Sequence, residues 1–268
     1  MANFNNSTLH SSTNNARIWT RGSFYKTSFN SFTADLTQTG QTSSITDPYA
    51  SLPTPTPGSC SFNNYAPSSG SSITLVPGTY CGGLSVTSFS NITFNAGTYY
   101  IANGDLYISS SNNVGCGNCT GGAGVTFVLT QTTGNNSDIG GVRITSENNV
   151  TLSAPNSGTY AGVLFYQDRR VPAGTMSSTS KIFTVSSLNN ATMAGAVYFP
   201  NNKIDIASIN NIGGTASTGC TIWIGRYVKL SSYNNAYKGG CGLYGTTPPG
   251  ISTTTTTTSS NNITKVLE

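Results

Sequence analysis

One short phrase recurs along most of this chain, and it constrains the fold more than any other feature. The phrase is an apolar residue, any residue, Ser, any residue and then Asn-Asn, as in residues 206–211 (IASINN). With similar copies ending at Asn91, Asn113, Asn149, Asn190 and Asn235, the last Asn recurs after 22, 36, 41, 21 and 24 residues. A repeat with a nearly constant minimum length and occasional insertions is typical of units that stack on one another.

The residues inside each repeat predict β-structure. Short alternating runs of Val, Ile, Thr, Phe and Tyr, broken by Gly and Asn, exclude helical repeats. The repeat that ends at Asn113 holds three such runs, at residues 92–94, 98–101 and 106–108. We therefore predict an all-β fold, a right-handed parallel β-helix or β-solenoid, with three short strands per coil stacked at about 4.8 Å around an apolar core.

The recurring Asn predicts a ladder at one corner of this stack. An Asn side chain can hydrogen-bond to the Asn above and below it, and Asn tolerates the left-handed backbone that a bend demands. The alternative is a row of Asn that binds a ligand. The predicted rungs are Asn91, Asn113, Asn149, Asn190, Asn211 and Asn235.

Composition shifts divide the chain into three parts. Residues 1–58 form an N-terminal arm or cap that ends in a Pro-rich connector, residues 59–242 carry the repeats, and residues 243–268 form a Thr-rich tail. Met1-Ala2 and Leu267-Glu268 resemble vector-derived ends. With such ends, the absence of an export signal or membrane anchor from this sequence says little about the native protein.

Charge argues against two classes of partner. Only 7% of the residues are charged and the net charge is +4, with no basic run. A diffuse excess of this size gives no reason to expect nucleic acid or an anionic membrane surface as a partner.

The six cysteines predict disulfides and an exported protein. We expect Cys60 to pair with Cys81, Cys220 with Cys241, and Cys116 with Cys119. Half of a zinc site at Cys116 and Cys119 is the alternative. The other cysteines lack that spacing and His10 is the one histidine, so we expect neither a metal nor another cofactor.

The acidic residues do not suggest catalysis. Asp105, Asp138, Glu147 and Asp205 lie at different offsets from the last Asn of their repeats, so they are not expected to share a face as a catalytic pair does. The charged cluster Asp168-Arg169-Arg170 is interpreted as a loop anchor. A Ser-His-Asp arrangement is not expected, because His10 lies in the arm. We predict no catalytic residues and no enzyme activity.

Alternation in the middle strands predicts an apolar outer stripe. If Val125, Phe127, Val163, Phe165, Ile222 and Ile224 point inward, then the outward residues are Val128, Leu164, Tyr166, Tyr198 and Trp223. Something should cover such a stripe. We expect residues 1–58 to cover it through the aromatic residues Trp19, Phe24, Tyr25, Phe29 and Phe32. In the alternatives, the stripe is an interaction face that docks a partner or stacks on sugar. The residues of that face are Leu164, Tyr166, Tyr198 and Trp223.

Five phrases, taken together and in order, resemble a known family. They are residues 77–84 (PGTYCGGL), 97–101 (GTYYI), 124–127 (GVTF), 162–169 (GVLFYQDR) and 197–201 (VYFPN). They are similar to the exported region of TadE/TadG-like proteins of bacterial Tad (Flp) pilus systems. The resemblance covers about residues 60–241.

This resemblance implies a non-enzymatic structural or adhesion protein of a bacterial surface pilus system. It implies an exported, membrane-anchored protein at the cell surface or in the periplasm, which contacts the membrane only through an anchor that this sequence does not contain. The expected partners are other pilus components, surface polysaccharide or a second copy of the chain. The alternatives are a β-helix protein that binds or degrades polysaccharide and an ice-binding protein. For ice binding the row of threonines after the corner is partial and is interrupted at Gly213; it comprises Thr74, Thr93, Thr126, Thr151 and Thr192.

Overall fold

The computed structural model describes residues 2–9, 16–20, 24–27, 34–38, 47–212, 221–236 and 263–266. Side chains are described for residues 47–210 and 221–231. One short 3-10 helix, η1 (Asn136–Asp138), accompanies the strands. The strands are β1 (Ala2–Leu9), β2 (Ala16–Thr20), β3 (Phe24–Thr27), β4 (Ala34–Gln38), β5 (Phe62–Tyr65), β6 (Gly70–Leu75), β7 (Gly78–Thr87), β8 (Phe89–Asn95), β9 (Gly97–Ala102), β10 (Leu106–Ser109), β11 (Asn113–Gly117), β12 (Val125–Thr130), β13 (Val142–Ser153), β14 (Val163–Gln167), β15 (Phe183–Ile212), β16 (Thr221–Ala236) and β17 (Ile263–Val266).

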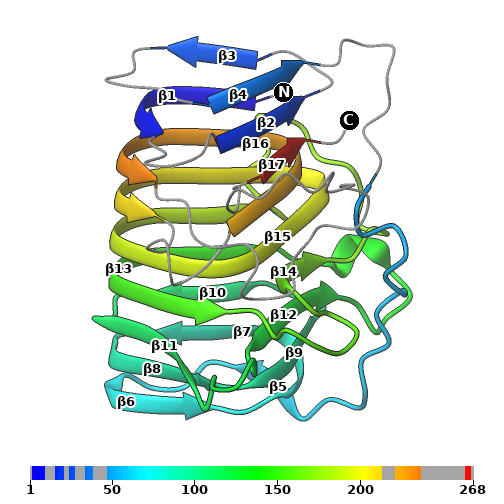
Figure 1. Cartoon of the computed structure of the whole chain (residues 1–268). Coiled ribbons are helices and arrows are strands. Elements are labelled where there is room, and N and C mark those ends of the chain that lie inside the picture. Colours follow the sequence, from blue (N-terminus) through cyan, green and yellow to red (C-terminus); the bar gives the residue numbers. More distant parts are fainter. Residues whose placement is uncertain are drawn as a thin grey trace.

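All strand pairings between these elements are parallel, and equivalent positions of successive repeats pair with each other. Asn91 pairs with Asn113, Asn113 with Asn149, and Asn149 with Asn190. Figure 1 shows the result as strands stacked in layers. The repeat in the sequence is therefore a repeat in space.

The predicted right-handed β-helix or solenoid, with three short strands per coil, is wrong. Several strands are long and run through the bends, above all β15 with 30 residues and β16 with 16. Seven strands pair in a closed ring, in the order β7, β9, β12, β14, β15, β13, β10 and back to β7. The fold is a closed seven-stranded parallel β-barrel with further strands outside the ring.

The reason for the continuous strands lies in how the chain bends. Five serines have positive φ angles, between 55° and 62°: Ser88, Ser110, Ser146, Ser187 and Ser208. Each lies three residues before the last Asn of its repeat. The left-handed residue is thus Ser, not Asn as we expected, and a single such residue turns the chain while its neighbours stay extended.

The bend also turns one side chain per repeat into the core. The residue after each of these serines is buried, and the Asn pair that follows is exposed wherever both of its side chains are described. The first pair has Ser90 in place of its first Asn, and Ser90 is exposed as well. The inward residues are Phe89, Ser111, Glu147, Leu188 and Ile209.

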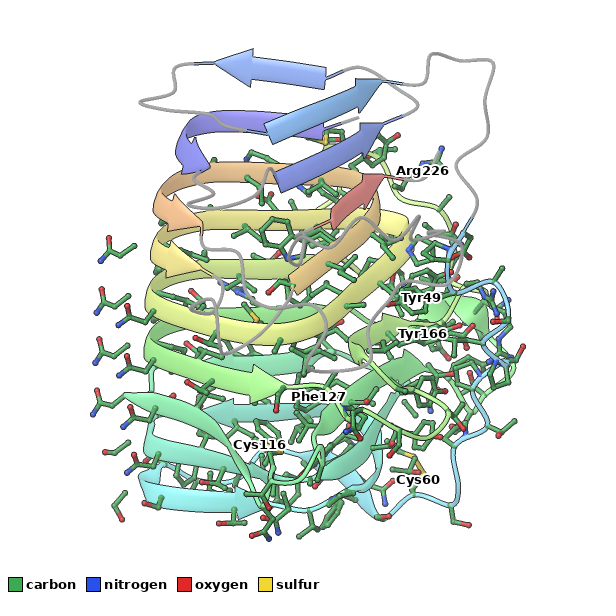
Figure 2. All side chains as sticks on the ribbon, viewed as in Figure 1. Tyr49, Cys60, Cys116, Phe127, Tyr166 and Arg226 are labelled. Atoms are coloured by element: carbon green, nitrogen blue, oxygen red, sulfur yellow. A yellow bond between two sulfur atoms is a disulfide. The ribbon has the colours of Figure 1, made fainter. Side chains whose placement is uncertain are left out.

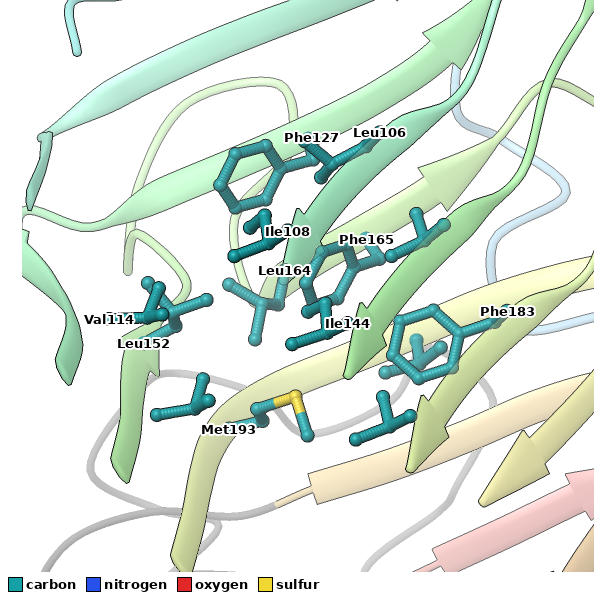
Figure 3. Close-up of a cluster of buried hydrophobic side chains, with 14 of the residues drawn as sticks. Leu106, Ile108, Val114, Phe127, Ile144, Leu152, Leu164, Phe165, Phe183 and Met193 are labelled. Carbon is teal, nitrogen blue, oxygen red and sulfur yellow. The ribbon is translucent and has the colours of Figure 1, made fainter. Parts of the chain in front are cut away.

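One apolar core fills the interior of the strands. Figure 3 shows part of it, where Leu106, Ile108 and Ile144 come from the strands before the bend and Phe127, Phe165 and Phe183 stand beside them. Aromatic rings follow one another through successive layers, and the centroids of Phe127 and Phe165 lie 5.1 Å apart in a stacked pair. Parallel pairing in register places like side chains above one another, so each apolar position is repeated from layer to layer.

The terminal strands extend the sheet beyond β16. β1 pairs with β16 and with β3, while β17 lies between β16 and β2, and β2 pairs with β4 (Figure 1). The division at residues 58 and 242 remains a prediction. Within the described residues, no helix is long and apolar enough to cross a bilayer.

The left-handed serines give a direct test of the bends. Ser187 is exposed with a φ of 59°. The Ser187→Val variant should lose about 1–2 kcal/mol of unfolding free energy, because a β-branched residue is strained in the left-handed region. The Ser187→Gly variant is the control and should be as stable as the parent. Denaturant unfolding measures both, and equal stability of all three proteins would contradict the left-handed bend.

Candidate binding face

The Asn ladder is built from side-chain amides that bond from layer to layer. Nδ2 of Asn113 donates to Oδ1 of Asn91 at 2.9 Å, and Nδ2 of Asn149 donates to Oδ1 of Asn113 at 3.1 Å. Asn190 donates to Asn149 in the same way at 3.1 Å. The backbone of Asn211 pairs with that of Asn235, but the side chains of both lie outside the described residues.

A second Asn column, whose members were not among the predicted rungs, runs beside the first. Nδ2 of Asn148 donates to Oδ1 of Asn112 at 2.9 Å, Asn189 donates to Asn148 at 2.8 Å, and Asn210 donates to Asn189 at 3.1 Å. The doubled Asn of the repeat was the signal for it. An amide has two N–H donors and two acceptor lone pairs, so Asn149, which donates once and accepts once in its column, retains capacity for a ligand.

A column of threonines lies two residues after the Asn column. Thr74 pairs with Thr93, and Thr151 pairs with Thr192, with Gly115 between the two pairs. Residues two apart on a strand point to the same side of the sheet, so Asn and Thr share one face. Thr126 does not belong to this face because its side chain is fully buried and donates to the carbonyl of Val163 at 2.8 Å.

We call this surface the Asn–Thr face, and its outward positions hold no charged residue. They are Ser72, Thr74, Val76, Asn91, Thr93, Asn95, Asn113, Gly115, Gly117, Asn149, Thr151, Ser153, Asn190 and Thr192. Layers of a parallel sheet recur at about 4.8 Å, so the face offers uncharged donors and acceptors on a fixed spacing.

A carboxyl group lies inside the same bend. Glu147 is 2% exposed, and its Oε2 accepts a hydrogen bond from the backbone N–H of Ser111 at 2.7 Å and another from the Ser111 hydroxyl. Its Oε1 has no hydrogen-bond partner among the described residues. Burial raises the pKa of Glu147 to about 7, although the two bonds from Ser111 act in the opposite direction.

The other described carboxylates are held by structural partners. Asp168 accepts from Thr130 at 2.8 Å and pairs with Arg170 at 2.6 Å. Burial alone would raise the pKa of Asp168, but these hydrogen bonds hold it below its usual value. Asp105 accepts from the N–H of Gly141, Asp138 from Thr133 and Asn135, and Asp205 pairs with Lys203. Across the described ranges, no group of three or more His, Cys, Asp or Glu is placed to hold a metal.

The predicted outer stripe exists, but its members differ from those expected. Tyr166 and Tyr198 stack at 5.1 Å in an outer cluster that also contains Val128, Val163, Ala196, Ile222 and Ile224. Leu164 and Trp223 instead belong to the main core. The register shifts between Val163 and Phe165, and Trp223 pairs with the inward residue Val197, so the alternation has the opposite phase at these positions.

A strap from the N-terminal part covers this outer cluster. Tyr49 packs edge-on against Tyr198 at 5.5 Å, and Leu52 packs beside it. Figure 2 shows Tyr49 and Tyr166 on the same flank of the molecule. Phe29 and Phe32 lie outside the described residues, and so do the side chains of Trp19, Phe24 and Tyr25.

Arg169 and Asp47 hold the strap in place. The Arg169 guanidinium donates to the carbonyls of Ala50, at 2.8 Å, and of Leu52, while the Tyr198 hydroxyl donates to Asp47 at 2.6 Å. Asp47 lies 3.9 Å from the guanidinium. The Asp168-Arg169-Arg170 cluster thus anchors a segment of chain.

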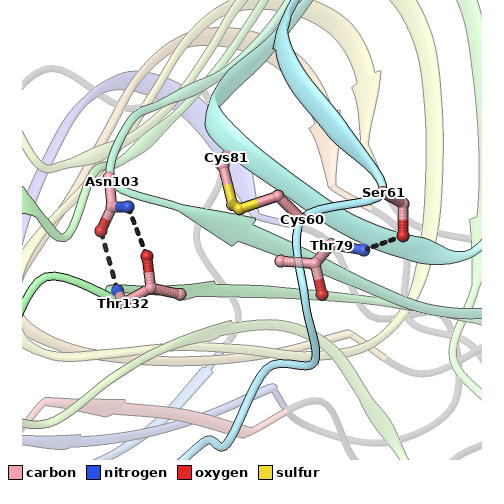
Figure 4. Close-up of a disulfide and its surroundings, with 6 residues drawn as sticks. All are labelled: Cys60, Ser61, Thr79, Cys81, Asn103 and Thr132. Atoms are coloured by element: carbon pink, nitrogen blue, oxygen red, sulfur yellow. Dashed lines mark hydrogen bonds between the residues drawn. A yellow bond between two sulfur atoms is a disulfide. The ribbon is translucent and has the colours of Figure 1, made fainter.

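Disulfides are present at two of the predicted positions. Cys60 is bonded to Cys81 at the first layers, where the N–H of Thr79 donates to Oγ of Ser61 (Figure 4). Cys116, in β11, is bonded to Cys119 in the loop that follows this strand. Cys220 and Cys241 lie outside the described residues.

Comparison with known proteins adds no relative. No protein-family model, no curated protein and no solved structure matches this chain.

Glu147 predicts an unusual pH dependence of stability. Its pKa is about 7 in the folded protein against 4.5 for an ordinary Glu, so between these values the folded state binds a proton that the unfolded state lacks. The contribution of Glu147 to the unfolding free energy should therefore fall as pH rises from 4.5 to 7, by up to about 3 kcal/mol.

The Glu147→Gln variant should lack this fall, because an amide does not titrate. Urea unfolding between pH 4.5 and 8 measures it, and the difference between variant and parent should change by that amount. Parallel pH profiles of the two proteins would contradict a buried carboxyl with a raised pKa.

Proposed function

We propose that this chain is a non-enzymatic, exported structural or adhesion protein of a bacterial surface pilus system. The observation that carries the adhesion part is the Asn–Thr face, where Asn113 and Asn149 repeat in register beside Thr93 and Thr151. Such a face suits a partner that is itself uncharged, repetitive and rich in hydroxyl groups, and surface polysaccharide has this chemistry.

Two further observations support this proposal. The disulfide between Cys60 and Cys81 suits an oxidising compartment, as expected for an exported protein. Two carboxylates of the middle repeats have structural partners, since Asp168 accepts a hydrogen bond from Thr130 and Glu147 accepts one from the backbone of Ser111. The pilus part of the proposal rests on the five phrases that resemble TadE/TadG-like proteins.

Co-sedimentation with insoluble cellulose and chitin tests the adhesion role. The chain should sediment with at least one of them. The double variant Thr93→Lys, Thr151→Lys should bind about tenfold more weakly, a loss of about 1.4 kcal/mol of binding free energy. The reason is that two long charged side chains replace two hydroxyl groups of the regularly spaced row. Thr184→Lys is the matched control, since Thr184 pairs with Arg143 on the strands before the bend.

Two results would contradict this role. One is absence of binding to either polysaccharide. The other is an equal loss of binding in the Thr184→Lys control, which would show that charge on any face weakens the interaction.

Ice binding is the second candidate, and one observation favours it. Four threonines, Thr74, Thr93, Thr151 and Thr192, stand in one column of the Asn–Thr face, broken at Gly115. Thermal hysteresis that the Thr93→Lys, Thr151→Lys variant abolishes would favour ice over polysaccharide. Hysteresis equal to that of an ordinary control protein would remove this candidate.

A further inference from the structure

The stack of strands ends at one side in an unpaired edge. Among the described residues, β5 pairs with β7 and β6 pairs with β8, and neither has a second neighbour. Figure 1 shows both strands in the last layer, at the end of the stack opposite β3 and β4. A strand with one neighbour presents a row of backbone N–H and C=O groups that another strand can bind.

This edge lacks the charges that commonly protect such strands. No Lys, Arg, Asp or Glu occurs between Asp47 and Asp105, and β6 itself reads GSSITL. β5 has a bulge between Asn63 and Tyr65, whereas the register of β6 with β8 is regular. β6 is therefore a regular, uncharged edge without proline, which favours addition of a further strand.

The apolar core is also incompletely covered at this end. Phe62, Tyr65 and Ile73 pack on the core but are only partly buried, and Phe62 stacks on Tyr80 at 4.6 Å. One more layer would continue the aromatic stack that runs from Phe62 into the core and would bury these side chains.

The strands at the opposite end of the stack run in a direction that allows parallel pairing with β5 and β6. There β3 pairs with β1 and β4 pairs with β2, with no further neighbour among the described residues, and all pairings in the structure are parallel. An added copy stacked end to end would therefore present β3 and β4 to β5 and β6 in the parallel direction. A twofold dimer through β6 would instead need an antiparallel pairing, which this structure does not use.

We propose that the β5–β6 edge is a docking surface for a second copy of this chain, whose β3–β4 edge adds to it as the next parallel layer. The two surfaces differ, so the contact is head-to-tail and can repeat without closing. This assembly is independent of what the Asn–Thr face binds.

Sedimentation of the whole chain over a range of concentrations tests the proposal. The weight-average mass should rise with concentration above 27.9 kDa and continue past that of two copies. The Ile73→Lys variant should remain a monomer, because Ile73 faces the open end of the core and a lysine there can stay solvated only while the end is free. Thr184→Lys is the control, since Thr184 lies in β15 away from both end layers, and it should assemble like the parent.

Hydrogen exchange gives a second measurement that does not depend on a variant. Amides of Ser71–Leu75 should exchange more slowly at high than at low concentration of the unmodified chain. A monomer at all concentrations, a dimer that grows no further, or equal loss of assembly in both lysine variants would overturn the proposal.

Discussion

A single left-handed residue in each repeat sets the position of nearly everything else in this protein. Ser110, Ser146 and Ser187 each turn the chain three residues before the last Asn, so the residues on either side of the bend stay extended and keep their partners in the neighbouring layers. If the bends were loops of variable length, the register between strands of successive layers would change. A change of one residue would exchange the inward and outward side chains. Fixed bends are thus what make columns of identical side chains possible.

These columns have different consequences inside and outside. Inside, Tyr99, Phe127 and Phe165 follow one another and bury a continuous apolar surface. Outside, the Asn side chains of each column hydrogen-bond to one another along the stack, on an exposed surface. Glu147 is the exception, a carboxyl at a position that holds Leu188 in the next layer, where its burial raises its pKa. Glu147 therefore makes the stability of the protein depend on pH, through one layer of a bend whose other inward residues are uncharged.

The sequence predicted the features that depend on local pattern. Alternating apolar residues indicated strands, and the recurring Asn indicated that equivalent positions of successive repeats lie together. It did not predict that strands such as β15 continue through the bends or that the pairings close into a ring, because pattern marks a bend without showing whether pairing stops there. The predicted outward orientation of Leu164 and Trp223 was wrong for a related reason. Pairing with β15 determines which residues of these strands point inward, and the sequence pattern does not show that pairing.

Nuclear magnetic resonance contacts between side-chain amides test the central claim, the register of the repeats, most directly. The side-chain amide of Asn113 should show nuclear Overhauser contacts to those of both Asn91 and Asn149, and Asn148 should show contacts to Asn112 and Asn189. Absence of the contacts along the columns, or contacts displaced by one or two residues, would contradict the account.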